Sequence, residues 1–331
     1  MPVVPMPRRR LHLVPIALLA LVLVAGVAVG LHLAQQAAST GSGAPLDPET
    51  GSPLGAQQTA NGPIAAPRLA TGLKLRLNGT KDPFAFPFKD PPKAGLLFDL
   101  DTGEVFWRKN PNKKLAIASV TKMMTSLLVV DRLEPGTRVP VTKEALAYTG
   151  SGVGVLPKGK SVGLSAMLHG LLLASGNDTA IALAQKTSGS VDEFVDDMNL
   201  HAQAMGMRCS HYASPSGIVD KGNYSCATDL AIQARAILDN PRLAPIVARR
   251  EAVLPFPIKG GKLYLYNHNP LLKQRYRGTL GVKTGYTDAA GKCIVVAVRR
   301  GKRRLGLVLL DSPDLAKQPM QIFDYAFRKL A

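Results

Sequence analysis

The chain has 331 residues, enough for one large domain or two small ones, and a formal net charge of +18 at pH 7. Its basic residues are spread along the sequence without the clustered stripe or interleaved aromatic rings that nucleic-acid binding requires, so no nucleic-acid partner is expected. The 6 histidines and 3 cysteines lack metal-ligand spacing, so neither a metal nor another cofactor is expected.

The N-terminal region has the pattern of a membrane anchor. Residues 1–12 end in a basic cluster, and residues 13–31 carry no charged side chain. A helix over residues 13–31 would be about 28 Å long, enough to cross a bilayer. We therefore expect a short cytoplasmic segment and an uncleaved transmembrane signal anchor, with the rest of the chain outside the cytoplasm. The alternative is cleavage near Ser39 and secretion of the protein.

Residues 32–90 are expected to form a flexible linker and a lead-in to a folded domain over residues 91–331. Residues 34–67 are rich in Gly, Ala, Pro, Gln, Ser and Thr, a composition that does not offset the entropy of ordering the chain. Residues 81–93 mix proline, phenylalanine and charge, and are expected to form an ordered strap that leads into the domain. The net positive charge favours attraction to anionic lipids and acidic polymers, or it reflects an arginine-rich composition without a partner.

The folded part begins with a predicted β-hairpin, residues 94–100 and 104–108, around an Asp-Thr-Gly turn. Helices are expected over residues 120–133, 161–174, 178–187, 190–206 and 228–238, the fourth of them beginning with a capping box at Ser190 and Glu193. Strands are then expected over residues 263–267, 280–287, 292–299 and 304–311, followed by a helix over residues 315–330. Two strands, many helices and a final group of strands with one helix indicate an α+β fold.

The most informative pair of residues is Ser119 and Lys122, which precede an apolar stretch over residues 123–130. At a spacing of three the two side chains share one face of a helix, about one turn apart. Burying an ammonium costs several kcal/mol unless it is paired or neutral. A neutral lysine beside a serine hydroxyl acts as a general base and turns that serine into a nucleophile. The alternative is a surface serine and a solvated lysine, because this spacing also arises by chance.

Two further motifs follow in the chain. Ser175 and Asn177 stand in a Ser-Gly-Asn sequence at the end of an apolar helix pattern, and a Lys-Thr-Gly sequence begins at Lys283 in a predicted strand. Alone, the first is an ordinary helix-ending turn and the second a solvated strand end. The order Ser-x-x-Lys, Ser-x-Asn, Lys-Thr-Gly marks the active-serine penicillin-recognising enzymes. With the flanking residues included, residues 92–330 closely resemble the serine D-alanyl-D-alanine carboxypeptidases, the low-molecular-mass penicillin-binding proteins.

The resemblance implies a β-lactamase/transpeptidase-like fold. This fold has a five-stranded antiparallel sheet flanked by helices, with an all-helical subregion and an active site between the two. The family hydrolyses the terminal D-alanyl-D-alanine bond of peptidoglycan stem peptides through a serine acyl-enzyme, and β-lactams inhibit it. Residues 91–331 would then be a D,D-peptidase domain on the outer side of a bacterial cell membrane, with the peptidoglycan pentapeptide as its partner in cell-wall and cell-shape metabolism.

The resemblance also implies roles for the residues that carry out the chemistry. Ser119 is the nucleophile, and Lys122 takes its proton, for which it must be neutral near pH 7. Burial and the nearby positive charge of Lys283 favour that neutral form. Ser175 is expected to relay the proton to the leaving D-alanine, and Asn177 to hold the substrate amide.

Substrate binding is assigned to the third motif. Lys283 and Thr284 are expected to bind the terminal carboxylate, and Gly285 to let the substrate backbone lie close to the strand. The backbone N–H groups of Ser119 and Tyr286 are expected to bind the oxyanion.

The chain departs from the family at three places. Residues 317–319 read Lys-Gln-Pro where relatives commonly place an arginine that helps to bind the carboxylate, so recognition is expected to depend more on Lys283. A Ser-Gly pair at Ser216 stands where relatives often have His-Gly. The sequence ends after the last helix, where many relatives continue into a β-rich domain and a membrane-binding tail, so anchoring is expected at the N-terminus.

Two other activities remain as alternatives, a D,D-endopeptidase acting on cross-links and a β-lactamase. A β-lactamase of this type adds a Glu-x-x-x-Asn segment between the second and third motifs. Glu193 and Glu251 are not followed by such an asparagine, which argues against this activity. A membrane-tethered sensor would need a cytoplasmic output domain, for which residues 1–12 are too short.

The cysteines fit an exported protein with one disulfide and one buried thiol. Cys209 and Cys226 bracket a segment without strong helix signals, and we predict that they are joined, with two free thiols as the alternative. Cys293 begins a continuous apolar run, residues 293–298, typical of a central strand, so it is expected to be an inert core residue.

Overall fold

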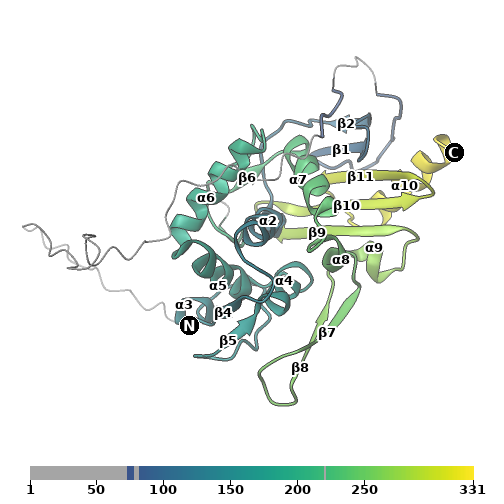
Figure 1. Cartoon of the computed structure of the whole chain (residues 1–331). Helices are drawn as coiled ribbons and strands as arrows, with labels where there is room; N and C mark the ends of the chain where they lie inside the picture. Colours follow the sequence, from purple (N-terminus) through teal and green to yellow (C-terminus); the bar gives the residue numbers. More distant parts are fainter. Residues whose placement is uncertain (1–72, 78–81, 220) are drawn as a thin grey trace, which may run out of the picture. The chain divides into compact units, whose positions relative to one another are not determined.

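A five-stranded antiparallel sheet organises the computed structural model, which describes residues 73–77, 82–219 and 221–331 (Figure 1). The strand order is β2-β1-β11-β10-β9, so the N-terminal hairpin pairs with the C-terminal strands through β1 and β11. The strands are β1 Ala94–Asp99, β2 Val105–Lys109, β9 Thr279–Thr287, β10 Gly291–Arg300 and β11 Arg303–Leu310. Their positions confirm the predicted hairpin, the last three predicted strands and the α+β class.

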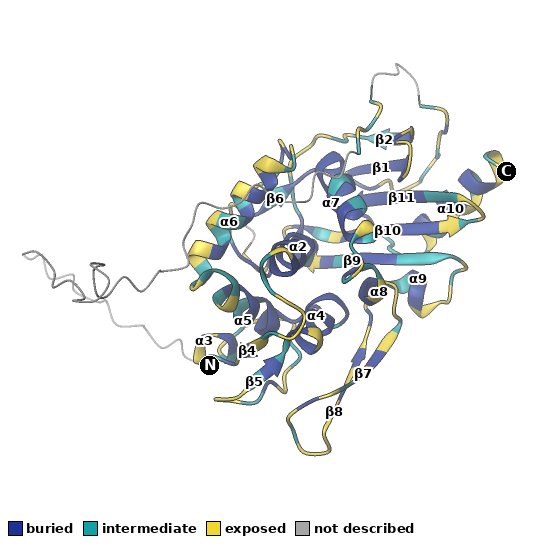
Figure 2. Cartoon of the chain, viewed as in Figure 1, coloured by how far each residue is buried: buried dark blue, intermediate teal, exposed yellow. Residues whose placement is uncertain are grey.

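Helices cover both faces of this sheet and also form a separate helical region. They are η2 Ala118–Thr121, α2 Lys122–Arg132, α3 Lys143–Leu146, α4 Leu164–Leu172, α5 Asn177–Ser188, α6 Val191–Ala204, α7 Ala227–Asp239, α8 Ala244–Val247, α9 Pro270–Lys273 and α10 Lys317–Lys329. The predicted cap of α6 is present, because the Ser190 hydroxyl accepts a hydrogen bond from the backbone N–H of Glu193. Helix α2 is buried along most of its length, which confirms its predicted burial (Figure 2).

The two faces of the sheet belong to two hydrophobic cores, because successive residues of a strand point to opposite faces. In β10, Val295 and Ala297 join the core that contains α2, α4 and α7, whereas Ile294 and Val296 join a smaller core against α10. Helix α7 packs on β1, β10 and β11. The continuous apolar run of β10 is therefore explained by burial on both sides.

Two of the predicted elements differ in the structure, the start of α4 and the place of β8 (Lys262–Tyr266). Ser161–Gly163 forms strand β5, paired with β4 (Arg138–Pro140), so α4 begins only at Leu164 instead of at residue 161. The β-branched Val162 is buried in this pair. Gly163 still has an extended backbone, so the strand includes it and the helix begins at the next residue.

The predicted strand at residues 263–267 exists as β8 (Lys262–Tyr266), but it lies outside the main sheet. It pairs with an unpredicted strand, β7 (Glu251–Pro255), in a hairpin that extends below the sheet in Figure 1. Short paired segments also join β3 (Leu115–Ala116) to β6 (Tyr224–Ser225). The pairing of β3 with β6 joins segments that are distant in sequence, which local periodicity does not report.

The described part of the lead-in packs on the folded domain. The ring of Phe84 stacks on Phe106 with centroids 5.4 Å apart, and Phe86 contacts Trp107 and Tyr325 edge to face. The predicted transmembrane segment, residues 13–31, and most of the predicted linker lie outside the described residues. No helix in residues 73–77, 82–219 or 221–331 combines the length and apolar composition needed to cross a bilayer.

Candidate active site

The candidate nucleophile lies in a tight turn where η2 meets the edge strand β9. Ser119 is the second residue of η2, and the preceding residue, Ala118, has a left-handed backbone with φ +47°. A non-glycine residue in this region is uncommon and is often found at functional sites. Lys122 begins α2, and its Nζ lies 2.8 Å from Ser119 Oγ. The three-residue spacing therefore brings the pair together as predicted.

Lys122 is fully buried and is surrounded by hydrogen-bond acceptors. Its Nζ lies 2.7 Å from Asn177 Oδ1 and 2.7 Å from the carbonyl oxygen of Ser216. Both oxygens only accept, so they take the two N–H groups of a neutral amine and leave its lone pair for the hydroxyl hydrogen of Ser119. The contacts are therefore those that a general base needs.

The electrostatic surroundings of Lys122 favour the same form. Burial in the protein interior and, second, the positive charge of Lys283 hold the pKa of Lys122 well below its usual value. The carboxylate of Asp178 acts in the opposite direction, but more weakly. An amine with a depressed pKa is available as a proton acceptor at a pH where an exposed lysine is not.

Ser175 occupies the turn between α4 and α5 and is nearly buried. Its backbone is left-handed, with φ +60°, which aims the side chain at the third motif. Lys283 donates hydrogen bonds to Ser175 Oγ at 3.0 Å and to the carbonyl oxygen of Thr284 at 2.9 Å. Burial lowers the pKa of Lys283 to about 7. The structure therefore links the second motif to the third through a buried lysine.

Asn177 is turned inward, and its expected role of holding the substrate amide stays a prediction. It is 2% exposed, its Oδ1 accepts from Lys122, and its Nδ2 donates to the carbonyl oxygen of Thr149. Both ends of the amide are thus engaged within the protein. As the first residue of α5, packed beside α2, Asn177 orients the lysine.

The start of α5 also holds a loop that the sequence did not indicate. The carboxylate of Asp178 accepts hydrogen bonds from the backbone N–H groups of Val153 and Gly154, at 3.1 and 2.9 Å. The backbone N–H of Asn177 donates to the carbonyl oxygen of Ser151 at 2.7 Å. These contacts fix Ser151 at the rim of the site.

Gly285 is required for the approach of η2 to β9. A Cβ at this position would lie 2.8 Å from the carbonyl oxygen of Ile117 and 2.9 Å from the backbone nitrogen of Ser119. No side chain fits at that separation. The glycine therefore places the backbone N–H of the nucleophile beside the strand that also carries Tyr286.

These elements enclose a pocket of about 520 Å³. Five of the predicted site residues line it, namely Ser119, Ser175, Thr284, Gly285 and Tyr286. The other three predicted residues, Lys122, Asn177 and Lys283, are buried behind this wall.

Four polar residues line the pocket without having been predicted: Ser151, His268, Lys292 and Asp314. Burial and, next, the positive charges of Lys283 and Lys273 lower the pKa of His268, so its ring is neutral near pH 7. His268 lies two residues after the end of β8, and Lys292 lies in β10. In the sequence, nothing marks them except that each lies close to an element of the site. This closeness becomes apparent only when the pairing of the strands is known.

The Ser-Gly pair at Ser216 acts through its backbone. The carbonyl oxygen of Pro215 accepts a hydrogen bond from Thr125 Oγ1 at 2.6 Å, and that of Ser216 accepts from Lys122. Gly217 has φ +77°, and a Cβ there would lie 2.0 Å from the carbonyl oxygen of Ala118. The segment therefore needs glycine for its close contact with η2, while any residue at position 216 offers the carbonyl.

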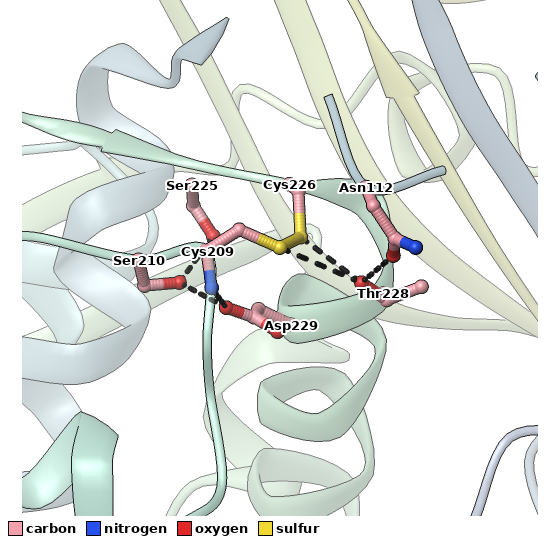
Figure 3. The surroundings of a disulfide bond; sticks show 7 residues. All are labelled: Asn112, Cys209, Ser210, Ser225, Cys226, Thr228 and Asp229. Atoms are coloured by element: carbon pink, nitrogen blue, oxygen red, sulfur yellow. Dashed lines mark hydrogen bonds between the residues drawn. A yellow bond between two sulfur atoms is a disulfide. The ribbon is translucent and has the colours of Figure 1, made fainter. Parts of the chain in front are cut away.

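A disulfide between Cys209 and Cys226 closes the segment that carries these carbonyl groups (Figure 3). Asp229 accepts hydrogen bonds from the backbone N–H of Cys209 and from Ser210 Oγ, both at 2.8 Å. Within the described residues, the one grouping of possible metal ligands is Cys209, Cys226 and Asp229, and bridged sulfurs offer no thiolate. Cys293 is buried in β10.

Replacing Cys226 by serine is expected to lower the free energy of unfolding by about 3 kcal/mol, because the bridge restricts the unfolded chain. Urea denaturation of the oxidised protein measures this change. The Cys209→Ser variant is the matched control, since loss of either sulfur removes the same bridge and both variants should agree. Unchanged unfolding free energies in both variants would show that the bridge does not form in solution.

The sequence is similar to a family of known proteins. A profile of the D-alanyl-D-alanine carboxypeptidase family matches residues 90–314. The chain is 35% identical over 243 residues to the carboxypeptidase DacF of Bacillus subtilis, covering 71% of this chain and 62% of DacF. It is 36% identical over 245 residues to DacB2 of Mycobacterium tuberculosis, covering 72% and 82%.

The fold is also similar to solved structures. A crystal structure of a D-alanyl-D-alanine carboxypeptidase from Mycobacterium tuberculosis H37Rv superposes with a TM-score of 0.69 and 33% identity, over 76% of this chain and 96% of that one. This likeness confirms the predicted transpeptidase-like fold. With the family profile matching most of its folded part, the chain belongs to the D-alanyl-D-alanine carboxypeptidase family.

Proposed function

We propose that this chain hydrolyses the terminal D-alanyl-D-alanine bond of peptidoglycan stem peptides through an acyl-enzyme on Ser119. The observation that carries the proposal is the 2.8 Å contact between the Ser119 hydroxyl and the buried amine of Lys122. The family relationship supports the same activity. Because the chain spans only 62% of the length of DacF, the substrate and activity are proposed from the site itself.

Acylation begins when the Ser119 hydroxyl gives its proton to Lys122 Nζ and its oxygen attacks the carbonyl carbon of the penultimate D-alanine. Backbone N–H groups of Ser119 and Tyr286 bind the resulting oxyanion. The C–N bond then breaks, and the Ser175 hydroxyl donates its proton to the leaving amine. The proton held on Lys122 then restores the Ser175 hydroxyl. Free D-alanine leaves, and the peptide stays as an ester on Ser119.

Deacylation repeats these steps with water as the nucleophile. Lys122 takes a proton from the water, the oxygen attacks the ester, and the proton returns to the oxygen of Ser119 as the ester bond breaks. Asn177 keeps the Lys122 amine in position through both stages, which is the role its buried amide supports.

Substrate binding is proposed at the edge strand β9, beside the pocket. An extended peptide adds to a sheet edge through backbone hydrogen bonds, and the hydroxyl of Thr284 lines the pocket that would receive the terminal carboxylate, with Lys283 buried behind it. A carboxylate close to Lys283 favours its protonated form, so substrate binding itself recharges a lysine whose pKa is about 7.

The experiment that tests this function measures D-alanine release from a pentapeptide alongside penicillin turnover. Release of D-alanine with slow loss of penicillin supports the proposal. Rapid penicillin hydrolysis without D-alanine release would instead identify a β-lactamase. Cleavage restricted to cross-linked peptides would identify an endopeptidase.

Amidating the terminal carboxylate of the pentapeptide is expected to lower kcat/KM by about 10²-fold, on the order of 3 kcal/mol of lost charge-assisted hydrogen bonding. A carboxypeptidase uses binding energy from this group to place the scissile bond, whereas an endopeptidase does not. Steady-state rates for the acid and the amide give the ratio, with a peptide amidated only at its side-chain carboxyl as the control. Equal rates for both termini would make endopeptidase the better description.

Residues 13–31 are proposed to anchor the enzyme in the bacterial cell membrane, with residues 1–12 in the cytoplasm, residues 32–90 as linker and lead-in, and the D,D-peptidase domain over residues 91–331 outside. Fractionation of cells should recover the full chain with the membranes. A chain lacking residues 1–31 should be released, with D-alanine release unchanged. A mature N-terminus near Ser39 and a protein free of the membrane would show that the segment is a cleaved signal.

A further inference from the structure

The pocket needs a fixed positive charge that the third motif does not supply. Lys283 is 2% exposed and already donates hydrogen bonds to Ser175 Oγ and the carbonyl oxygen of Thr284. Burial lowers its pKa to about 7, so near neutral pH a large fraction of the molecules carry it uncharged before substrate arrives. A carboxylate entering from water therefore does not meet a permanent charge at this residue.

Lys292 is placed to provide that charge. It lies in β10 directly opposite Tyr286 of β9, so the two side chains lie on the same face of the sheet. Thr284 is two residues from Tyr286 and also shares this face. Among the described residues that line the pocket, Lys292 carries the one side-chain ammonium, since His268 is neutral.

The side chain of Lys292 contacts the adjacent segment before α10 and keeps donors available. Its Nζ donates to the carbonyl oxygen of Pro313 at 3.1 Å, and the neighbouring Ser312 donates its backbone N–H to the carbonyl oxygen of Lys292 at 2.9 Å. An ammonium has three N–H donors, so this contact leaves two for a ligand. The side chain is exposed.

An acidic residue in the same segment, Asp314, lies near this charge and is bound mainly by other groups. Asp314 accepts hydrogen bonds from the backbone N–H groups of Ala316 and Lys317, both at 2.7 Å, at the start of α10. Burial acts to raise the pKa of Asp314, but these two hydrogen bonds and then the positive charges of Lys317 and Lys292 lower it. The carboxylate is thus held mainly by the helix end, within electrostatic reach of the Lys292 ammonium.

We propose that Lys292 is the specificity-determining residue that recognises the free carboxylate at the end of the substrate. The inference rests on the proposed function. Residues 317–319 contain no arginine, and the inference assigns the role of that arginine in carboxylate binding to Lys292 in β10. The substrate carboxylate would lie between the hydroxyl of Thr284 and the ammonium of Lys292. Lys283 would act mainly through Ser175, at the scissile bond.

The test compares acid and amide forms of the pentapeptide with wild-type protein and the variants Lys292→Ala and Lys292→Arg. Lys292→Ala is expected to lower kcat/KM for the acid by about 10-fold to 30-fold, mainly through KM, because one charge-assisted contact is lost. The amide should change by less than about twofold, and Lys292→Arg should restore most of the preference for the acid. Lys302→Ala is the matched control, an exposed lysine beyond the other end of β10, and should leave both rates unchanged.

A second arm uses penicillin and its carboxylate methyl ester, with the rate of Ser119 acylation as the readout. Lys292→Ala should slow acylation by the free acid and leave that by the ester unchanged. Equal losses for acid and ester, or no loss for either, would overturn the assignment of Lys292 even if D-alanine is released normally. Acylation without any D-alanine release would refute the proposed function, while the acid-to-ester ratio would still decide the role of Lys292.

Discussion

Replacing Ser119 by alanine is expected to abolish the covalent penicillin adduct and to lower D-alanine release by at least about 10⁴-fold. The acyl-enzyme forms on the oxygen of Ser119, and without it the remaining groups bind substrate but have no nucleophile to offer. The loss is large because Ser119 and Lys122 act as one unit, in direct contact at 2.8 Å. The residual rate would come from the oxyanion-binding N–H groups alone.

Intact-protein mass spectrometry after incubation with penicillin measures the adduct, and peptide mapping locates it. Ser165→Ala is the matched control, since Ser165 is exposed near the start of α4 and should leave labelling unchanged. Melting curves should show that both variants are folded. Labelling that survives in Ser119→Ala, or that maps to another serine, would remove the assignment of the nucleophile.

Replacing Lys122 by methionine is expected to slow penicillin acylation by about 10³-fold, the scale of a lost general base. Methionine has a similar length and suits the buried site, but it has no lone pair able to take the proton of Ser119. The wild-type rate should also fall as the pH is lowered through the pKa of Lys122, because the protonated amine is no longer a base. Since burial holds that pKa well below its usual value, this fall should occur far below the range where exposed lysines titrate.

Stopped-flow acylation measured across pH separates the two parts of this prediction. The methionine variant should lose both the rate and the fall with decreasing pH, whereas Lys302→Met, a change at an exposed position, should keep both. The Lys122→Met change also removes the hydrogen-bond donor to Asn177 Oδ1 and to the carbonyl oxygen of Ser216. The free energy of unfolding of this variant measures how much stability is lost with these two contacts. A wild-type acylation rate in this variant would show that another group takes the proton.

Much of the fold was accessible from sequence because its signals are local. The apolar stretch after Lys122 predicts a buried helix through its composition, and the uninterrupted apolar run from Cys293 predicts a strand covered on both faces. The spacing of Ser119 and Lys122 depends only on the geometry of one helical turn, so the contact between them was predictable. The order of the three motifs then indicated the family without any knowledge of how they meet in space.

Only the tertiary structure decides which of these residues face the pocket and which lie buried behind it. The carbonyl oxygen of Ser216 reaches Lys122 from 94 positions away, and a backbone carbonyl has no side-chain signature that a sequence pattern displays. Asn177 turns toward Lys122 because α5 packs beside α2, and Lys283 is buried behind the pocket wall because β9 meets η2 at Gly285. Lys292 reaches the pocket only through the pairing of β10 with β9. Residue type and local spacing determine which chemistry is available, whereas packing between distant segments determines which groups face the substrate and which are withdrawn from water.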